Sequence, residues 1–494
     1  MAALQALAAP RPLAALPAQQ FVSLRSFCPP ARPQARRRRS CHPPPAAAAA
    51  EELLLGARPL VLPTVPIPEA DQLPPFQEWH RHPELLTGCE PDAAPLQVAV
   101  LLSGGVDSSL ALHLLKAAGH HVTAFYLQIW FQEDFRNFWD ACPWEEDLAY
   151  CQAVCKRLGV ELRMVPLTDQ YWDRVVAHCI SEIRQGRTPN PDVLCNSRVK
   201  FGAFYEYLEK EHGAAFDRVA SGHYARLERG PVAGIAAAPA GAAGQAGEAA
   251  AQLPPLAQQQ QQCEEQQQDV RLALTPDAVK DQTYFLAHLS QRQLARTLFP
   301  LGHLTKPQVR ALAEAADLPN KARKDSQGIC FLGKVKFSEF VREHLGEWPG
   351  PIVEEESDEV VGYHRGFWFH TVGQRKGIPL SGGPWYVTRK DPHHNAVYVS
   401  RQYHEHAHRR DAFTCGPISW CSAARPDPAL PLFCKVRHGP HMYGCQLEAS
   451  SDGSSELRVT LDGNDQGLAA GQFAVFYQAG VCLGSAVITG CDAY

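Results

Sequence analysis

The feature that most constrains this chain is an apolar run at 98–102, followed directly by the sequence S-G-G-V-D-S at 103–108. The run predicts a buried parallel strand, and the glycines predict a sharp turn into a helix. Adjacent glycines let several backbone N–H groups point at one anion, where the helix dipole adds positive potential. The Walker A pattern, with its Lys followed by Ser or Thr, is missing. The loop is therefore typical of a pyrophosphate loop (PP-loop) in enzymes that cleave ATP to AMP and pyrophosphate. A plain glycine turn is the alternative.

The pattern around this loop predicts an α/β doubly wound parallel sheet. Strand-like segments at 97–102, 122–129, 160–166 and 217–220 alternate with helical segments at 108–118, 145–158 and from about 169. Ligands of such sheets bind at the carboxyl ends of the strands, where the loop lies. A helical pattern follows from 281 to 325, and 308–316 is amphipathic.

Beyond 349 the pattern changes to short strand-like segments with glycine turns. They lie at 385–388, 396–400, 432–437, 446–448, 457–461 and 472–477. Such spacing predicts a small β domain and then a β-barrel.

We expect five parts in the 494 residues. They are a disordered transit peptide at 1–60, a Pro-rich linker at 61–95, a catalytic PP-loop domain at 96–335, a central small β domain at 336–405 and a C-terminal β-barrel at 406–494. Inside the catalytic domain, the Ala/Gln-rich stretch 229–269 has no periodicity and predicts a disordered insertion. It interrupts an expected hairpin between 224–228 and 270–274.

The first 50 residues carry seven arginines and no Asp or Glu, which is typical of an organellar transit peptide. A disordered basic tail that binds nucleic acid is the alternative. We expect import into a plastid or mitochondrion and removal of the segment. Without these arginines, 40 basic and 52 acidic residues remain, a formal net charge of −12. Any RNA contact must therefore come from local basic patches. No run of about 18 apolar residues is present, so we expect no membrane association.

The sixteen cysteines include no paired C-x-x-C zinc pattern and indicate a reducing compartment. Cys151 and Cys155 lie four apart in an expected helix and are interpreted as ordinary helix-face cysteines rather than metal ligands. Two other cysteines have settings that favour a thiolate. Cys195 ends the sequence G-R-T-P-N-P-D-V-L-C at 186–195, near an expected helix N-terminus. Cys330 ends D-S-Q-G-I-C at 325–330, just after the basic cluster 321–324.

The segment before Cys195 predicts more than a reactive thiol. Asn190 and Pro191 suit the N-cap and the first position of a helix. Asp192 would then lie on the same helix face as Cys195, three residues away. It could accept a proton or hold a substrate N–H. A capping carboxylate beside a buried cysteine is the alternative.

These motifs occur in order with S-G-H-Y at 221–224, K-D-Q-T-Y-F-L at 280–286 and H-T-V-G-Q-R-K-G at 370–377. In this the chain resembles the tRNA-specific 2-thiouridylases, the bacterial and organellar MnmA family, from about 97 to 488 apart from the insertion. The resemblance implies a sulfurtransferase that adenylates C2 of the wobble uridine of tRNA. Sulfur transfer from a cysteine persulfide then gives 2-thiouridine, AMP and pyrophosphate. It also implies ATP with Mg²⁺, tRNA and a persulfide donor, either a cysteine desulfurase or a relay protein. We expect a monomer.

The resemblance also implies a role for each matching residue. Cys330 would carry the persulfide, Cys195 would be the partner thiol that closes a disulfide with it, and Asp192 would manage a proton or orient the base. The nucleotide would contact Leu102, Ser103, Gly104, Gly105, Val106, Asp107, Ser108, Leu127 and Gly222. The tRNA would contact Asn190, Pro191, Asp192, His223, Lys280, Asp281, Gln282, Arg437, His438 and Gln472.

Three places depart from the family pattern. Leu127 stands where many bacterial members have methionine, an apolar exchange that keeps the contact plausible. His438 stands where an Arg-Tyr pair is usual, which puts a stacking or hydroxyl contact to RNA there in doubt. The segment 131–139 is richer in aromatic residues than in typical bacterial members, and we expect an active-site loop without an assigned role.

Two other classes of protein fit parts of the chain. Another PP-loop enzyme, an amidotransferase or ligase, would need an ammonia-producing domain or partner, and no glutaminase signature is present. An RNA-binding barrel protein with a decayed ATP site would not be expected to keep Ser103, Asp107, Ser108 and both cysteines. Pyrophosphate release that depends on tRNA would separate the three classes.

Overall fold

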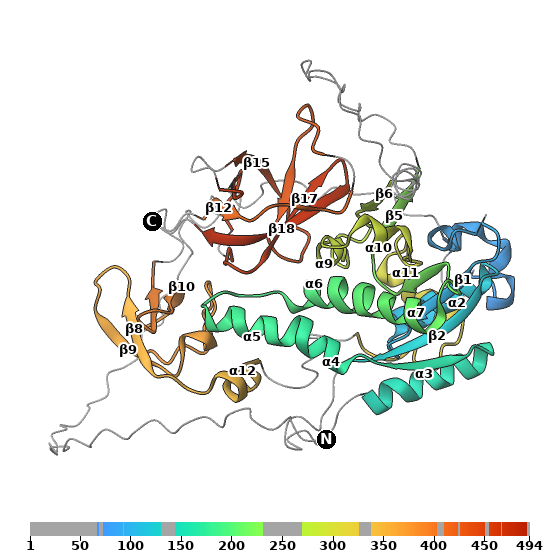
Figure 1. Ribbon diagram of the computed structural model, residues 1–494, viewed down its shortest axis with the longest axis horizontal. Coiled ribbons are helices and arrows are strands. Elements are labelled where there is room, and N and C mark those ends of the chain that lie inside the picture. The colour runs from blue at the N-terminus through green and yellow to red at the C-terminus, as the bar shows by residue number, and fades with distance from the viewer. Residues whose placement is uncertain are drawn as a thin grey trace, which may run out of the picture. The chain divides into compact units, whose positions relative to one another are not determined.

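Five parallel strands form the sheet that carries the S-G-G-V-D-S loop (Figure 1). They are β1 (Gln97–Leu101), β2 (His121–Gln128), β3 (Leu162–Pro166), β4 (Arg218–Ser221) and β7 (Thr297–Leu298), in the order β3-β2-β1-β4-β7. Every neighbouring pair is parallel. The expected α/β doubly wound sheet is confirmed.

The computed structural model describes residues 67–68, 73–91, 93–129, 144–230, 269–325, 337–402, 410–422, 425–449, 454–465 and 467–491. All of them belong to one unit, Leu55–Tyr494. The expected transit peptide, most of the Ala/Gln-rich insertion, the aromatic segment 131–139 and Cys330 lie outside the described residues. Within these ranges, every helix is too short or too polar to cross a lipid bilayer.

Alternate residues of β1 pack into two different cores. Val98 and Val100 join apolar side chains of α2 (Val106–Ala117), α3 (Trp144–Leu158) and α11 (Lys306–Ala315). Ala99 and Leu101 join a second cluster that includes the helical segment 171–208. Both faces of the sheet are therefore covered, which explains why β1 is a continuous apolar run and not an alternating one.

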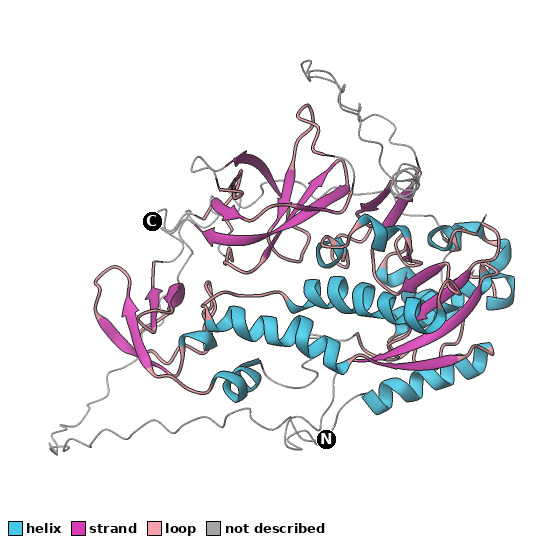
Figure 2. Ribbon diagram, viewed as in Figure 1, coloured by secondary structure: helices cyan, strands magenta, loops and turns pink. Residues whose placement is uncertain are grey.

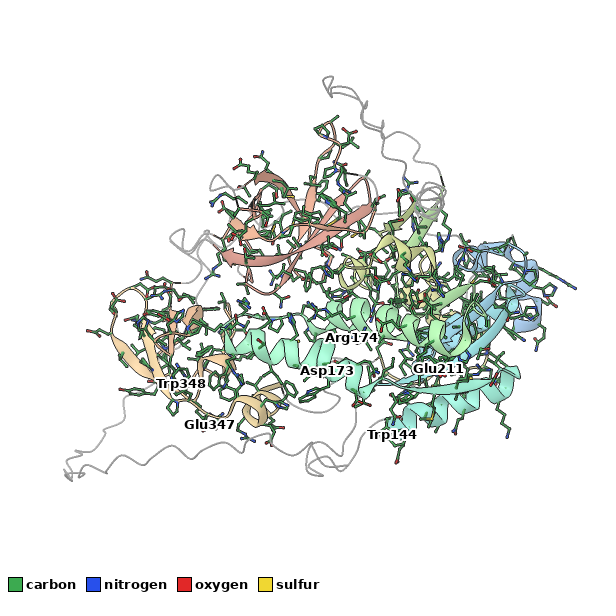
Figure 3. All side chains as sticks on the ribbon, in the orientation of Figure 1. Trp144, Asp173, Arg174, Glu211, Glu347 and Trp348 are labelled. Carbon is green, nitrogen blue, oxygen red and sulfur yellow. The ribbon has the colours of Figure 1, made fainter. Side chains whose placement is uncertain are left out.

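Two long helical segments on the second face contain π-helical turns. One runs through α4 (Thr168–Tyr171), η5 (Trp172–Val176) and α5 (Ala177–Arg184); the other runs through α6 (Pro191–Cys195), η6 (Asn196–Ala203) and α7 (Phe204–His212). Arg174 Nη1 donates to the Arg198 carbonyl at 3.3 Å, and Arg198 Nη1 donates to the Arg174 carbonyl at 2.9 Å. Arg174, labelled in Figure 3, also pairs with both carboxylate oxygens of Glu206. These contacts hold two π turns together, and such turns are frequent at functional sites.

Strands dominate the chain beyond α12 (Phe337–Leu345), as Figure 2 shows in magenta. A four-stranded sheet has the order β10-β11-β8-β9. Its strands are β8 (Gly350–Glu354), β9 (Val360–His364), β10 (Tyr386–Asp391) and β11 (Ala396–Ser400). The expected central β region is present, although β8 and β9 were not anticipated from the sequence.

The C-terminal strands close into a barrel in the order β12-β16-β15-β14-β17-β18, with β12 pairing back to β18. The strands are β12 (Ala412–Cys415), β14 (Phe433–Lys435), β15 (Tyr443–Ala449), β16 (Leu457–Leu461), β17 (Phe473–Gln478) and β18 (Val481–Cys491). The short β13 (Ser419–Trp420) also pairs with β18. The barrel expected from the sequence is confirmed.

The expected hairpin exists, but it does not belong to the catalytic sheet. It consists of β5 (Arg226–Arg229) and β6 (Val270–Ala273), with Arg229 directly opposite Val270. β6 pairs with β18, so the hairpin extends the sheet of the C-terminal barrel. The segments 96–335 and 406–494 are thus joined by backbone hydrogen bonds as well as by side chains.

Candidate active site

The carboxyl ends of three neighbouring strands bring the predicted nucleotide residues together. β1 lies between β2 and β4, and Leu101 is in register with Phe125 of β2 and Ser221 of β4. Leu127 is near the end of β2, and Gly222 follows β4 directly. The loop after β1 is therefore flanked by both residues, as the edge of a parallel sheet requires.

Two glycines make this arrangement sterically possible. Gly104 has a φ of +75°, and a Cβ there would lie 2.5 Å from the Asp147 carbonyl oxygen. A Cβ on Gly222 would lie 2.7 Å from the backbone nitrogen of Ser108. A side chain at Gly104 would collide with α3, and one at Gly222 would collide with the first turn of α2.

The loop is closed on itself by its serines. Ser108 Oγ accepts from the backbone N–H of Ser103 at 3.1 Å and donates to the Gly105 carbonyl at 3.1 Å. The two serine hydroxyls lie 3.1 Å apart. Leu102 and Val106 are buried and anchor the loop at both ends. No side chain caps α2, so its first-turn N–H groups suit an anion.

Asp107 is held by two donors that the sequence did not reveal. Its Oδ1 accepts from the Tyr224 hydroxyl at 2.9 Å and from Lys306 Nζ at 2.7 Å. Burial, and then the charge of Asp107, raise the pKa of Tyr224, so the phenol remains protonated and donates. Lys306 is nearly buried, with 13% of its side chain exposed.

Lys306 continues this chain of charges to Asp325. Its Nζ lies 2.9 Å from Asp325 Oδ1, while Lys280 Nζ lies 2.8 Å from Asp325 Oδ2. Arg310 also pairs with Asp325. Burial raises the pKa of Asp325, but hydrogen bonds from Lys280 and Lys306 outweigh it and hold the pKa well below its usual range. The nucleotide loop, the K-D-Q segment and the residue that begins D-S-Q-G-I-C are thus one electrostatic unit.

The three residues of the K-D-Q segment have different surroundings. Lys280 is partly exposed and faces Asp325. Asp281 is 2% exposed; its carboxylate accepts from the backbone of Thr275 and Thr283, and Lys435 Nζ lies 3.8 Å away. Gln282 Oε1 accepts from the Tyr224 backbone at 2.9 Å. Asp281 is therefore buried against the outer face of barrel strand β14, where Lys435 lies, and its contact with tRNA stays a prediction.

The segment before Cys195 docks on the barrel. Asn190 caps α6 by accepting from the Val193 N–H at 3.3 Å, and its amide donates to Gln472 Oε1 at 3.3 Å. Gln472 Nε2 in turn donates to the Thr188 carbonyl at 2.8 Å. The predicted N-cap is confirmed, and two predicted tRNA contacts from distant parts of the chain are brought together.

Asp192 and Cys195 lie on α6 as predicted, in the first and last turns of this short helix. Asp192 Oδ1 is buried and has no hydrogen-bond partner among the described residues. A buried carboxylate oxygen without a partner destabilises the folded protein unless a ligand supplies a hydrogen-bond donor. The Cys195 thiol is 1% exposed, and the π-helical segment η6 begins directly after it.

The remaining predicted tRNA residues are placed as follows. His223 is half-buried beside Phe201 and Phe299, and burial lowers its pKa well below the usual value, so the ring is neutral at pH 7. Arg437 is exposed and binds the buried carboxylate of Asp465 at 2.8 Å. His438 stacks on Phe285 at a centroid distance of 4.8 Å. Pro191 opens α6. Their RNA contacts stay predictions.

Two interpretations of other residues can be compared with the structure. Cys151 and Cys155 are buried on α3, the helix on which they were predicted, and burial raises their pKa values to about 12 and about 11. Two side chains of the basic cluster 321–324 form ion pairs with carboxylates. Lys321 pairs with Glu314 and Asp317, and Arg323 pairs with Asp147.

Sequence reasoning missed four supporting residues. Tyr224 and Lys306 hold Asp107, while Asn320 and Arg323 donate to the Gly104 carbonyl at 2.7 and 3.0 Å. Tyr224 lies inside a recognised motif, so a signal existed. Arg323 belongs to the basic cluster 321–324, which the sequence also singles out. Lys306 and Asn320 lie between motifs, and only the folded chain brings them to the loop.

The parallel sheet and the uncapped loop define a nucleotide-binding α/β protein of the PP-loop class. Three family profiles match the chain. They are described as "tRNA methyl transferase HUP domain" over 96–334, "tRNA methyl transferase PRC-barrel domain" over 338–401 and "Aminomethyltransferase beta-barrel domain" over 410–488.

Curated relatives match over nearly their whole length. The tRNA-specific 2-thiouridylase MnmA of Parabacteroides distasonis is 38% identical over 401 residues, covering 80% of this chain and 99% of the relative. The MnmA 1 protein of Bacteroides thetaiotaomicron is 39% identical over 402 residues, covering 80% and 100%. The chain belongs to the tRNA-specific 2-thiouridylase family, MnmA, which is a family of sulfurtransferases.

Solved structures match much more weakly. The NMN synthetase of Francisella tularensis aligns with a TM-score of 0.28 at 15% identity, covering 55% of this chain and 81% of that chain. Nothing further follows from so low a score.

Replacing Lys306 by Met should slow ATP-dependent pyrophosphate release by about tenfold or more. The change leaves Asp107 and Asp325 without their shared cation, and breaking a partly buried ion network costs a few kcal/mol. Steady-state pyrophosphate release in the presence of tRNA measures the effect.

Lys321→Met is the matched control, because the two carboxylates with which Lys321 pairs among the described residues are largely exposed. It should behave as the wild type. Equal rates for Lys306→Met and the wild type would contradict a role for the ion network.

Proposed function

We propose that this protein is an ATP-dependent tRNA-uridine 2-sulfurtransferase that acts on the wobble uridine. The full-length match to 2-thiouridylases carries the proposal, because it includes the nucleotide loop, both cysteine segments and the barrel. The uncapped start of α2 beside Gly222 supports ATP as the activating substrate.

ATP would place its phosphates on the loop between Ser103 and Ser108. Asp107 Oδ1 is already occupied by Tyr224 and Lys306, while Oδ2 has no hydrogen bond among the described residues. That oxygen fits Mg²⁺, which would neutralise charge between the phosphates when bound. Lys306 would keep the Asp107 carboxylate correctly oriented. The adenine would lie toward Leu127 and Gly222.

The chemistry needs three displacement steps. Uracil O2 attacks the α-phosphorus of ATP, pyrophosphate leaves, and the N3 proton is lost, so that C2 carries a good leaving group. The terminal sulfur of a Cys330 persulfide then attacks C2 and AMP leaves with the original oxygen. Finally the Cys195 thiolate attacks Cys330 Sγ, which forms a disulfide and releases the sulfur on C2 as a thiolate; N3 takes up a proton, and C2 becomes the thiocarbonyl of 2-thiouridine. A two-electron thiol reductant must reopen the disulfide, and a persulfide donor must reload Cys330.

Asp192 is the residue best suited to hold the uracil. Its buried, unpartnered Oδ1 matches a single N–H donor, and N3–H is the donor next to the reacting C2. Neighbouring Asn190 and Gln472 already bind each other and define the adjoining wall. An anticodon loop can present its base with little unstacking cost.

Cys195 must become accessible for the last step. It is buried here, and η6 begins at the next residue. A π-helical turn can convert to an α-helical turn by shifting one residue, which would rotate α6 without unfolding it. We infer that this shift exposes the thiol when tRNA binds.

Cys330→Ala and Cys195→Ala should each abolish 2-thiouridine formation while tRNA-dependent pyrophosphate release continues. The reason is that adenylation precedes both thiol steps. Nucleoside mass spectrometry and a pyrophosphate assay on the same reaction measure the two steps separately.

Cys179→Ala is the matched control, because Cys179 is also buried in the same core but lies on α5.

Asp192→Asn should slow both steps with unchanged tRNA affinity. Thiolation by Cys330→Ala with a persulfide donor would contradict its role. Pyrophosphate release without tRNA would favour another PP-loop enzyme.

We also propose that residues 1–60 direct import into a plastid or mitochondrion. The seven arginines of residues 1–50, a stretch that contains no Asp or Glu, support it. A fluorescent protein fused after residue 60 should accumulate in one of these organelles. A diffuse cytosolic signal would contradict the proposal.

A further inference from the structure

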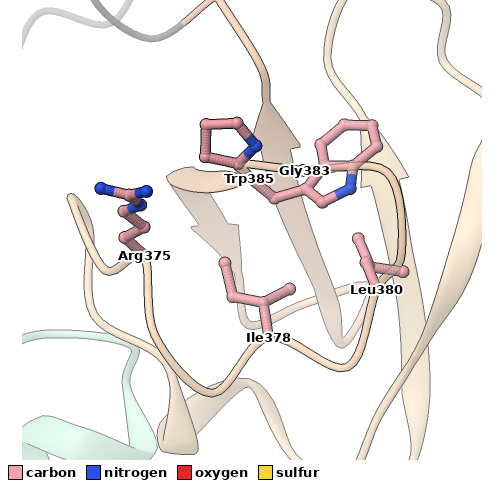
Figure 4. A pocket seen from close by; sticks show the side chains of 6 residues that line it. Arg375, Ile378, Leu380, Gly383 and Trp385 are labelled. Carbon is pink, nitrogen blue, oxygen red and sulfur yellow. The ribbon is translucent and has the colours of Figure 1, made fainter. Parts of the chain in front are cut away.

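A pocket in the central β region has no role in the reaction described above. It has a volume of about 340 Å³ and is lined by Arg375, Ile378, Leu380, Gly383, Pro384 and Trp385. Figure 4 shows Arg375 at one end, Leu380 at the other and Ile378 between them. The lining contains no carboxylate. Its residues belong to the H-T-V-G-Q-R-K-G segment and to the loop that leads into β10.

The aromatic wall of the pocket is held in place. Trp385 is 8% exposed, and its Nε1 donates to the Ser381 carbonyl at 2.9 Å. The Arg401 guanidinium lies 4.8 Å from the indole centroid and pairs with Glu354 at 2.8 Å. The indole is therefore fixed before any ligand arrives, which lowers the entropy lost on binding.

The loop that presents Arg375 is also braced. Gln374 donates its backbone N–H to the Thr371 carbonyl at 2.9 Å, and its side-chain amide donates to the Lys376 carbonyl at 2.9 Å. Val387 of β10 donates to the Gln374 carbonyl at 3.0 Å. Arg375 and Lys376 are thereby presented on a supported turn at the protein surface.

The charge at the pocket mouth is not neutralised. Arg375 and Lys376 are exposed, and neither has an ion-pair partner among the described residues. The Arg375 guanidinium lies 5.9 Å from the centroid of the Tyr386 ring. In a chain with a negative formal charge, two unpaired cations beside a fixed indole form a local site for an anion that carries an apolar or aromatic group.

We propose that this pocket binds one unpaired nucleotide of the substrate tRNA, with the base against Trp385 and Ile378 and a backbone phosphate on Arg375. The inference rests on the proposed function, which supplies a single-stranded RNA loop. Aromatic side chains next to Arg or Lys are the usual means of binding single-stranded RNA. The volume is at the lower end for small-molecule sites and suits a single base.

Two variants separate the phosphate contact from the base contact. Arg375→Ala should weaken tRNA binding by about five- to twentyfold and reduce the slope of log affinity against log salt by about one. Ile378→Trp fills the pocket but keeps the cation, so affinity should fall while the salt slope stays unchanged. Fluorescence anisotropy with unmodified tRNA over a salt series, without ATP, measures both.

Arg365→Ala is the matched control, because Arg365 is an exposed arginine of the same region that pairs with Glu347. It should leave affinity and slope unchanged. If the wild-type enzyme thiolates tRNA but Arg375→Ala shows unchanged tRNA affinity and an unchanged salt slope, the pocket proposal alone would be overturned. A wild type that fails to thiolate would instead overturn the proposed function.

The test also identifies a protein ligand if that is the true occupant. In that case the pocket variants bind tRNA normally and form 2-thiouridine with sulfide, but fail to form it with a cysteine desulfurase or relay protein. This result would overturn the RNA proposal in favour of a sulfur-donor site.

Discussion

The structure of this site depends on one nearly buried ammonium group. Lys306 Nζ contacts Asp107 in the nucleotide loop and Asp325 at the start of the second cysteine segment. Because only 13% of the Lys306 side chain is exposed, water screens its attraction to the two carboxylates weakly. Lys280 and Arg310 complete the neutralisation of Asp325. A charge that enters the nucleotide loop therefore changes how strongly Lys306 is attracted to Asp325. In the proposed reaction this links ATP cleavage to the segment that carries the sulfur.

The barrel is a second structural component of the active site. Gln472 fixes the Asn190 loop, Tyr284 donates to the Phe473 carbonyl at 3.1 Å, and β6 extends the barrel sheet through β18. Two of the residues that would contact tRNA, Asn190 and Gln472, therefore also hold the barrel against the helices. Binding of RNA at Asn190 or Gln472 would act on the position of α6 and its cysteine. This arrangement explains how a substrate base and a protein thiol could be positioned by one set of contacts.

Much of this could be predicted from the sequence because local patterns decide it. The loop follows from glycines between an apolar strand and a helix, and the α6 cap follows from Asn190 and Pro191. The amphipathic stretch 308–316 lies on α11, and the capping box between Thr305 and Gln308 explains why this helix begins at Lys306. Strand β18 was missed because it is rich in small residues: Gly484 approaches the Ser419 carbonyl too closely for any Cβ. Contacts between distant segments, such as Lys306 with Asp107 or β6 with β18, leave no local pattern.

The central claim is that the nucleotide loop serves to activate uracil O2 by adenylation. Isotopic labelling tests it most directly: tRNA with ¹⁸O at O2 of the wobble uridine is thiolated by the full enzyme with ATP and a persulfide donor, and the released AMP is analysed by mass spectrometry. The account predicts one ¹⁸O atom in the phosphate of AMP for every 2-thiouridine formed. Unlabelled AMP, with the ¹⁸O recovered in water or pyrophosphate, would contradict it.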